Sequence, residues 1–167
     1  MIKTYPRFGI LSGAGPMAGA LLYQRVIALL QEKGAWRDGD FPFITLVNLP
    51  FSDMLDGNFS CPVITKELLK GLSFLRKQSD YIYIACQTLH AYLSVENIKE
   101  FGVVSLLNLL NQALQQETRE IQIVASKISR LFNLHGKNID KICTYIEHQR
   151  SENAIDEILK GKNPSLD

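Results

Sequence analysis

The sequence lacks a charge excess, long apolar runs and any clustering of cysteines. The net charge is only +1, so no strong attraction to nucleic acid or to an anionic membrane is expected. No apolar run is long enough to span a bilayer, and the N-terminal segment MIKTYPRFGILSGAGP leaves no room for a secretory apolar stretch before its glycines and proline. These absences favour a cytoplasmic protein that binds neither nucleic acid nor membrane.

The cysteines and histidines are few and far apart. Cys61, Cys86 and Cys143 are odd in number and form neither a CxxC pair nor a disulfide framework, which indicates reduced thiols in a reducing compartment. His135 and His148 have no partners at metal-ligand spacing, so no metal site is predicted.

What is present is an alternation of apolar strands and amphipathic helices. The 167 residues are 46% hydrophobic, enough for a sizeable core without disulfides or metal. Apolar segments predict strands at 7–12, 43–48, 81–86 and 121–126, and a short fourth strand beginning near 102. Helical spacing predicts helices at 17–32 and 62–77, another after His90, and mostly helix or connector over 127–134, 138–149 and 151–160. This order predicts an α/β fold with a doubly wound parallel sheet.

Three of the predicted strands end in residues that are unusual for a sheet. These are Ser12 with Gly13, Asn48, and Cys86. Because ligands of such sheets bind beyond the C-terminal ends of the strands, we expect the three loops to line one site.

The segment SGAGP (12–16) follows the first strand. Glycines at this place allow backbone N–H groups to approach a carboxylate or phosphate at a helix N-terminus. The spacing is not the G-x-G-x-x-G of dinucleotide sites, and Pro16 removes one donor while fixing the helix start. A tight strand-to-helix turn without a ligand explains the segment equally well.

The segment ACQTLH (85–90) follows the third strand. Cys86 is predicted to point into the cleft, where N–H dipoles lower a thiol pKa and favour a thiolate base. Gln87 and Thr88 offer donors for a carboxylate. His90 either orients or polarises the groups of the site, or only caps the next helix. The alternative for Cys86 is an inert buried thiol.

Together these segments resemble the aspartate/glutamate racemase family. The family's glycine-rich G-G-x-G-P turn corresponds to LSGAGPMAGALLY, its C-N-T-x-H motif to Cys86-Gln87-Thr88-Leu89-His90, and its second strand to FPFITLVNLP. The similarity covers most of residues 7–126 in order. It is weaker afterwards, where DEILKGK (156–162) resembles a late segment whose lysine binds the substrate carboxylate, here Lys160.

The resemblance implies a flavodoxin-like fold and a two-base mechanism. One cysteine thiolate removes the α-proton of a small amino acid, and a second thiol, from a second lobe, returns a proton to the opposite face, with no cofactor or metal. The implied ligand site comprises Ser12, Gly13, Asn48, Gln87, Thr88 and Lys160 beside catalytic Cys86.

The sequence departs from the family pattern in three ways. No strand leading to the family's G-C-T-E cysteine is found, because the apolar residues around Cys143 have helical spacing and favour a helical core. Met54 stands where the family has a substrate-binding arginine. Gln87 replaces asparagine, which displaces a donor by roughly 1 Å, enough to disturb a well-aligned site.

These features lead to two functional hypotheses and one expectation of assembly. Residues 1–100 are predicted to form a first lobe with the Cys86 site, and 101–167 an incomplete second lobe of a C-terminally shortened chain. The protein is either a cofactor-independent aspartate/glutamate racemase or an inactive relative that binds a small carboxylate or acts through a partner chain. An incomplete lobe is expected to expose apolar residues and favour a homodimer. The residues expected to be exposed are Val103, Val104, Ile121 and Ile123.

Overall fold

The computed structural model describes residues 5–52, 60–135 and 143–145, together with Asn153 and Glu157. The chain divides into two compact units, one comprising Met1–Asp53 with Phe59–Ser105 and the other Met54–Asn58 with Leu106–Asp167. In the part of the chain that is described, no helix is long and apolar enough to cross a membrane.

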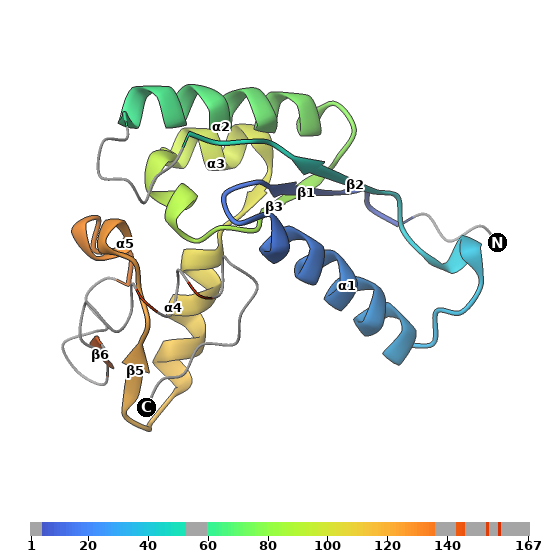
Figure 1. Cartoon of the computed structure of the whole chain (residues 1–167). Helices are drawn as coiled ribbons and strands as arrows, with labels where there is room; N and C mark the ends of the chain where they lie inside the picture. The colour runs from blue at the N-terminus through green and yellow to red at the C-terminus, as the bar shows by residue number, and fades with distance from the viewer. Residues whose placement is uncertain (1–4, 53–59, 136–142, 146–152, 154–156, 158–167) are drawn as a thin grey trace. The chain divides into compact units, whose positions relative to one another are not determined.

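The first unit is built on a parallel sheet of four strands in the order β2-β1-β3-β4 (Figure 1). Its strands are β1 (Phe8–Ser12), β2 (Ile44–Asn48), β3 (Tyr81–Ile84) and β4 (Val103–Val104). This confirms the parallel α/β fold that the alternation of strand and helix patterns predicts. β3 is shorter than predicted, since it ends two residues before Cys86.

Helices cover both faces of this sheet. The helices α2 (Cys61–Arg76) and α3 (Val95–Phe101) lie on one face, and α1 (Pro16–Glu32) lies on the other (Figure 1). α1 and α2 each have a proline in the first turn, where the missing N–H costs no hydrogen bond. Two short 3-10 helices, η1 (Asp38–Asp40) and η2 (Thr88–Tyr92), lie in the connections.

The core of the first unit lies between α2 and the sheet. α2 buries Ile64, Leu68, Leu72 and Leu75, which recur at helical spacing, and the sheet contributes Leu11, Ile82 and Ile84 from β1 and β3. Full burial of each such side chain contributes about 1.5–3 kcal/mol. The packing of α2 on the sheet therefore fixes β1 and β3, whose C-terminal ends lead into the candidate site.

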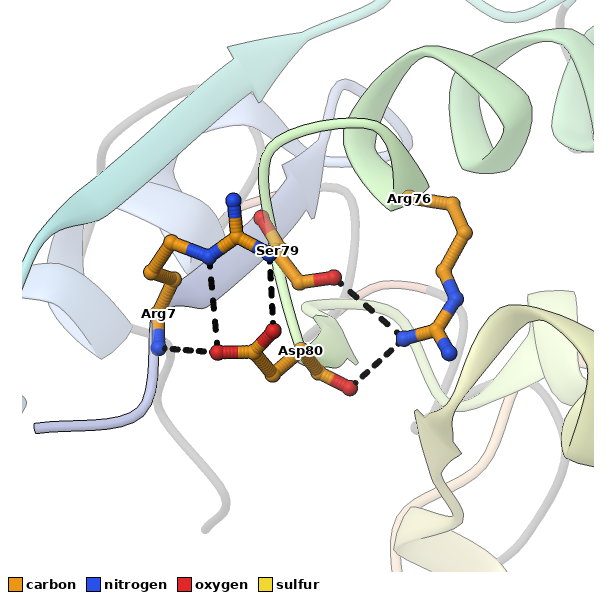
Figure 2. A network of polar contacts seen from close by, with 4 residues as sticks. All are labelled: Arg7, Arg76, Ser79 and Asp80. Atoms are coloured by element: carbon orange, nitrogen blue, oxygen red, sulfur yellow. Dashed lines mark hydrogen bonds and ion pairs between the residues drawn. The ribbon is translucent and has the colours of Figure 1, made fainter.

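An ion-pair network joins the starts of β1 and β3, at the sheet edge opposite the predicted site (Figure 2). The Arg7 guanidinium donates to the Asp80 carboxylate, with Nη2 2.8 Å from Oδ1, and the Arg7 backbone N–H donates to Oδ2 at 2.8 Å. These hydrogen bonds from Arg7 lower the pKa of Asp80 to about 2. Arg76 Nη1 donates to the Asp80 carbonyl at 2.8 Å, so α2 is attached to the same point.

The second unit contains β5 (Ile121–Ile123) and β6 (Cys143–Tyr145), which pair in parallel, and the helices α4 (Leu106–Gln116) and α5 (Lys127–Leu131). The prediction of a helix through Cys143 was wrong, because Cys143 begins a strand. Thr144 and Tyr145, β-branched and aromatic, favour a strand, and a period read over so few residues does not separate the two structures.

The expected exposure of four apolar residues was also wrong. Val103 is buried, and Val104, Ile121 and Ile123 are half-buried. Val103 pairs with Ile82 of β3, and β5 is covered on one edge by β6. These four residues therefore give no support to a homodimer.

The end of β1 lies very close to the segment that follows β2. The Leu49 N–H donates to the Ser12 carbonyl at 2.9 Å, and a Cβ placed on Gly13 would lie 1.7 Å from the Leu49 carbonyl oxygen. Gly13 also has a φ of 125°, which side chains rarely permit. Only glycine fits at this position, for both reasons.

We predict that Gly13→Ala destabilises the protein more than Gly34→Ala does. Gly34 shares the positive φ (92°) but has no atom within 4 Å of an added Cβ, so it isolates the backbone strain, roughly 1–3 kcal/mol. Gly13→Ala adds the collision with Leu49. Urea denaturation of both variants measures the difference, and equal destabilisation would contradict the close approach.

Candidate functional site

The structure places the three predicted strand ends at one edge of the first sheet. Ser12 pairs with Asn48 at the ends of β1 and β2, and Leu11 pairs with Ile84 at the end of β3. The Ala85 N–H still donates to the Leu11 carbonyl at 2.8 Å, so Cys86 is the second residue beyond β3. The backbone thus brings Ser12, Asn48 and Cys86 to a common C-terminal edge.

Ser12 and the glycines around it form a tight turn into α1. Ser12 is buried, and its hydroxyl donates to the Pro16 carbonyl at 3.2 Å. Gly15 caps the N-terminus of α1 with a φ of 82°, and an added Cβ on Gly19 would lie against the Ser12 hydroxyl. Ser12 therefore fixes the start of α1, and the backbone around Gly13, which is half-buried, is the part of the turn open to a ligand.

Asn48 is exposed at the end of β2, and the loop after it is attached to α2. The Glu67 carboxylate accepts from the Ser52 N–H at 3.0 Å and from the Ser52 hydroxyl at 2.9 Å. This pair fixes the path of the chain immediately after Asn48. The sequence pattern did not reveal it, because residues 15 apart are joined only by the fold.

Cys86 is half-buried, and opposing effects act on its thiol. Burial raises the pKa of Cys86, while hydrogen bonds from the backbone of Leu89 and Thr88 and from the Thr88 side chain lower it. The pKa of Cys86 lies above the ordinary value for a thiol, because the effect of burial is larger than that of the hydrogen bonds. The lowering effect of N–H donors that the sequence suggests is present, but it does not prevail, so the thiol form predominates at neutral pH.

His90 holds the segment that carries Cys86. It is buried, and its Nδ1 lies 3.1 Å from the Cys86 carbonyl oxygen, which can only accept, so Nδ1 carries the proton. Burial lowers the pKa of His90, and the imidazole is neutral at neutral pH. Of the roles predicted for His90, this hydrogen bond supports orientation of the Cys86 loop.

Tyr92 is a residue near the candidate site that the sequence did not indicate. Its side chain is buried, and burial is the main reason that its pKa rises to about 12, with further contributions from Cys61 and then Cys86. Cys61, the first residue of α2, is exposed, and its proximity is one cause of the raised pKa of the phenol. The packing of η2 against α2 brings Tyr92 close to Cys61, and no local sequence motif predicts this contact.

Two predicted site features lie elsewhere. Lys160 and Met54 are outside the described residues. Cys143 is the first residue of β6 and pairs with Ile121, the first residue of β5, at the N-terminal edge of that two-stranded sheet. Within the described ranges, no three His, Cys, Asp or Glu side chains gather as metal ligands.

Comparisons with known proteins address the fold. No protein-family model and no curated protein sequence matches the chain. An aspartate racemase from Picrophilus torridus superposes with a TM-score of 0.71 at 18% identity, over 93% of this chain and 69% of that one. An aspartate racemase homologue from Pyrococcus horikoshii superposes with a TM-score of 0.68 at 15% identity, over 95% of this chain and 74% of that one. A glutamate racemase from Aquifex pyrophilus superposes with a TM-score of 0.59 at 17% identity, over 89% of this chain and 64% of that one.

The chain has the fold of the aspartate and glutamate racemases. This confirms the fold class that the resemblance implies from the glycine-rich turn and the Cys86–His90 segment. It also agrees with the position of both segments at the C-terminal edge of the sheet, where doubly wound folds bind ligands.

We predict that Cys86 in the folded protein reacts with iodoacetamide with an apparent pKa above that of the same thiol in the urea-unfolded chain. The reason is that burial disfavours the thiolate more than its hydrogen bonds favour it. The rate is measured against pH in a Cys61→Ser/Cys143→Ser background, which leaves one thiol.

Thr88→Val should raise this apparent pKa further, because the variant loses the hydroxyl hydrogen bond to the sulfur. Thr118→Val, at an exposed position in the second unit, is the matched control and should have no effect. A Cys86 midpoint at or below that of the unfolded chain would contradict the account.

Proposed function

We propose that the protein belongs to the aspartate/glutamate racemase family and removes the α-proton of a dicarboxylic amino acid with the Cys86 thiolate. The observation that supports this most strongly is the position of Cys86: it follows β3 at the sheet edge shared by Ser12 and Asn48, and its sulfur receives hydrogen bonds from Thr88 and Leu89. A thiol with donors beside it at a ligand-binding edge fits proton transfer next to a carboxylate.

The roles of the neighbouring residues follow from charge. The backbone around Gly13 and the side chains of Gln87, Thr88 and Asn48 offer donors for the substrate carboxylates, with Lys160 as a further predicted contact. Negative charge spreads onto the α-carboxylate as the proton leaves, so donors aimed at its oxygens stabilise the transition state. Neither a metal nor an organic cofactor is required in this scheme.

The raised pKa of Cys86 sets the pH dependence of the proposed reaction. A base of higher pKa removes a proton more readily, but a smaller fraction of the thiol is ionised at neutral pH. Exchange should therefore increase with pH until Cys86 is fully ionised. His90 contributes by fixing the Cys86 backbone through the hydrogen bond between its Nδ1 and the Cys86 carbonyl.

A second candidate function is binding, or one-sided proton exchange, without racemisation. The observation that favours it is the position of Cys143 at the beginning of β6, since sites of parallel sheets lie beyond the opposite ends of the strands. On this basis Cys143 does not supply the second thiol, and the protein has one base. A cytoplasmic location and a homodimer remain predictions.

We predict that the protein exchanges the α-proton of L-aspartate or L-glutamate for deuterium but inverts the configuration much more slowly. A single base removes and returns the proton on the same face, whereas inversion needs a donor on the other face. Both enantiomers are incubated in deuterated water, and deuterium uptake and enantiomer ratio are followed together. Cys86→Ala should reduce exchange by at least about 100-fold.

Cys143→Ala is the matched control and should leave the exchange unchanged. Racemisation as fast as exchange, lost in Cys143→Ala, would show a complete two-thiol site and contradict the single-base account. If wild type and Cys86→Ala exchange equally, the catalytic role of Cys86 is wrong, and calorimetric titration with the same amino acids then decides whether the edge binds a carboxylate.

A further inference from the structure

The helix α1 is packed tightly against the sheet near its beginning and loosely near its end. At the beginning, an added Cβ on Gly19 would touch the Ser12 side chain, which shows how closely helix and strand approach. Gly19 is the one buried residue among the 17 of α1, although most of the helix is apolar. Figure 1 shows α1 diverging from the strands toward its C-terminal end.

A cavity of about 430 Å³ lies between α1 and the sheet, where the two diverge. Five of the described residues that line it come from α1 beyond its first turn and from its C-terminal cap, and the other four come from β1, β2 and β3. The lining residues are Leu22, Val26, Leu29, Leu30 and Lys33 on the helix side, and Phe8, Ile10, Ile44 and Tyr83 on the sheet side. The volume is within the range of small-molecule sites, roughly 300–1,000 Å³.

The lining combines an apolar interior with one charged group. Seven of the nine residues are apolar, Tyr83 is aromatic with a hydroxyl, and Lys33 is the sole charged member. A cavity of roughly 150 Å³ accommodates benzene, so this one has room for an apolar group two to three times as large. Apolar walls with a single charged group are typical of sites that bind an amphiphile and orient it.

Lys33 is available to a ligand because the groups around it are already paired. The residue caps the C-terminus of α1 and is exposed. The acidic neighbour Glu32 pairs with Arg25 at 2.9 Å. The carbonyl of Leu30 accepts from the Ala35 N–H at 3.0 Å and that of Gln31 from the Gly34 N–H at 2.9 Å, so backbone donors satisfy the helix end.

We propose that this cavity binds an amphiphilic carboxylate, a medium-chain fatty acid in its chemistry, with the alkyl chain between α1 and the sheet and the carboxylate at Lys33. The site is distinct from the proposed proton-transfer site. The lining residues of β1 are Phe8 and Ile10, at the start and in the middle of the strand, whereas the Cys86 loop begins beyond the strand ends. Binding here does not depend on whether the protein is a racemase.

The experiment compares ligands with one alkyl chain and three head groups. Calorimetric titrations with decanoate, decanol and decyltrimethylammonium are done below the concentrations at which these compounds aggregate. We expect saturable one-to-one binding, strongest for decanoate. Lys33→Glu should weaken decanoate binding by roughly five- to tenfold and strengthen binding of the ammonium compound, because the charge at the cavity mouth is reversed.

Two further variants separate the cavity from the rest of the surface. Val26→Phe, which fills the space, should weaken binding of all three compounds, with circular dichroism confirming the fold. Lys77→Glu reverses the lysine that caps α2 and should leave decanoate binding unchanged. Equal binding of the three head groups with no response to Lys33→Glu would overturn the proposal. Absence of saturable decanoate binding, the result if a second copy or another segment fills the cavity, would also overturn it.

Discussion

The close approach of main chains at the end of β1 is the constraint on which the candidate site depends. Gly13 lies against the peptide of Leu49, and Gly19 lies against Ser12, so the turn after β1 contacts both the segment after β2 and the first turns of α1. Hydrogen bonds from Leu49 to Ser12 and from Ala85 to Leu11 extend the same alignment to the third loop. The three loops follow strands that end at the same edge of the sheet. The buried side chains between α2 and the sheet hold these strand ends in register.

At the other edge of the sheet, a different chemistry fixes the strands. The carboxylate of Asp80 accepts from the side chain and main chain of Arg7, and Arg76 binds the adjacent carbonyls. Gly102 leaves room for this arrangement, since an added Cβ would lie 2.8 Å from the Asp80 carbonyl oxygen. Charged groups thus secure the starts of β1 and β3, while neutral donors and a thiol occupy the ends. This division leaves the candidate site free of fixed ion pairs among the described residues.

The sequence predicts the parts of this arrangement that follow from local periodicity. β1, α1, β2 and α2 fall within one or two residues of the predicted ranges, because each has an unbroken apolar pattern and a clear glycine or proline boundary. Cys143 was misassigned because a short run of apolar residues fits both helical and strand spacing. The approach of Tyr92 to Cys61, the attachment of Ser52 to Glu67 and the burial of Cys86 arise from contacts between distant segments, which local patterns do not encode.

The central claim is that the loops after β1, β2 and β3 form one site for a carboxylate. Amide chemical shifts of the ¹⁵N-labelled protein, titrated with L-aspartate and L-glutamate, test it most directly. The account predicts saturable shifts that concentrate at Gly13, Leu49 and the Gln87–Leu89 amides, with little change around Arg7 and Asp80 at the opposite edge. Shifts confined to other regions, or no saturable shifts with either amino acid, would contradict it.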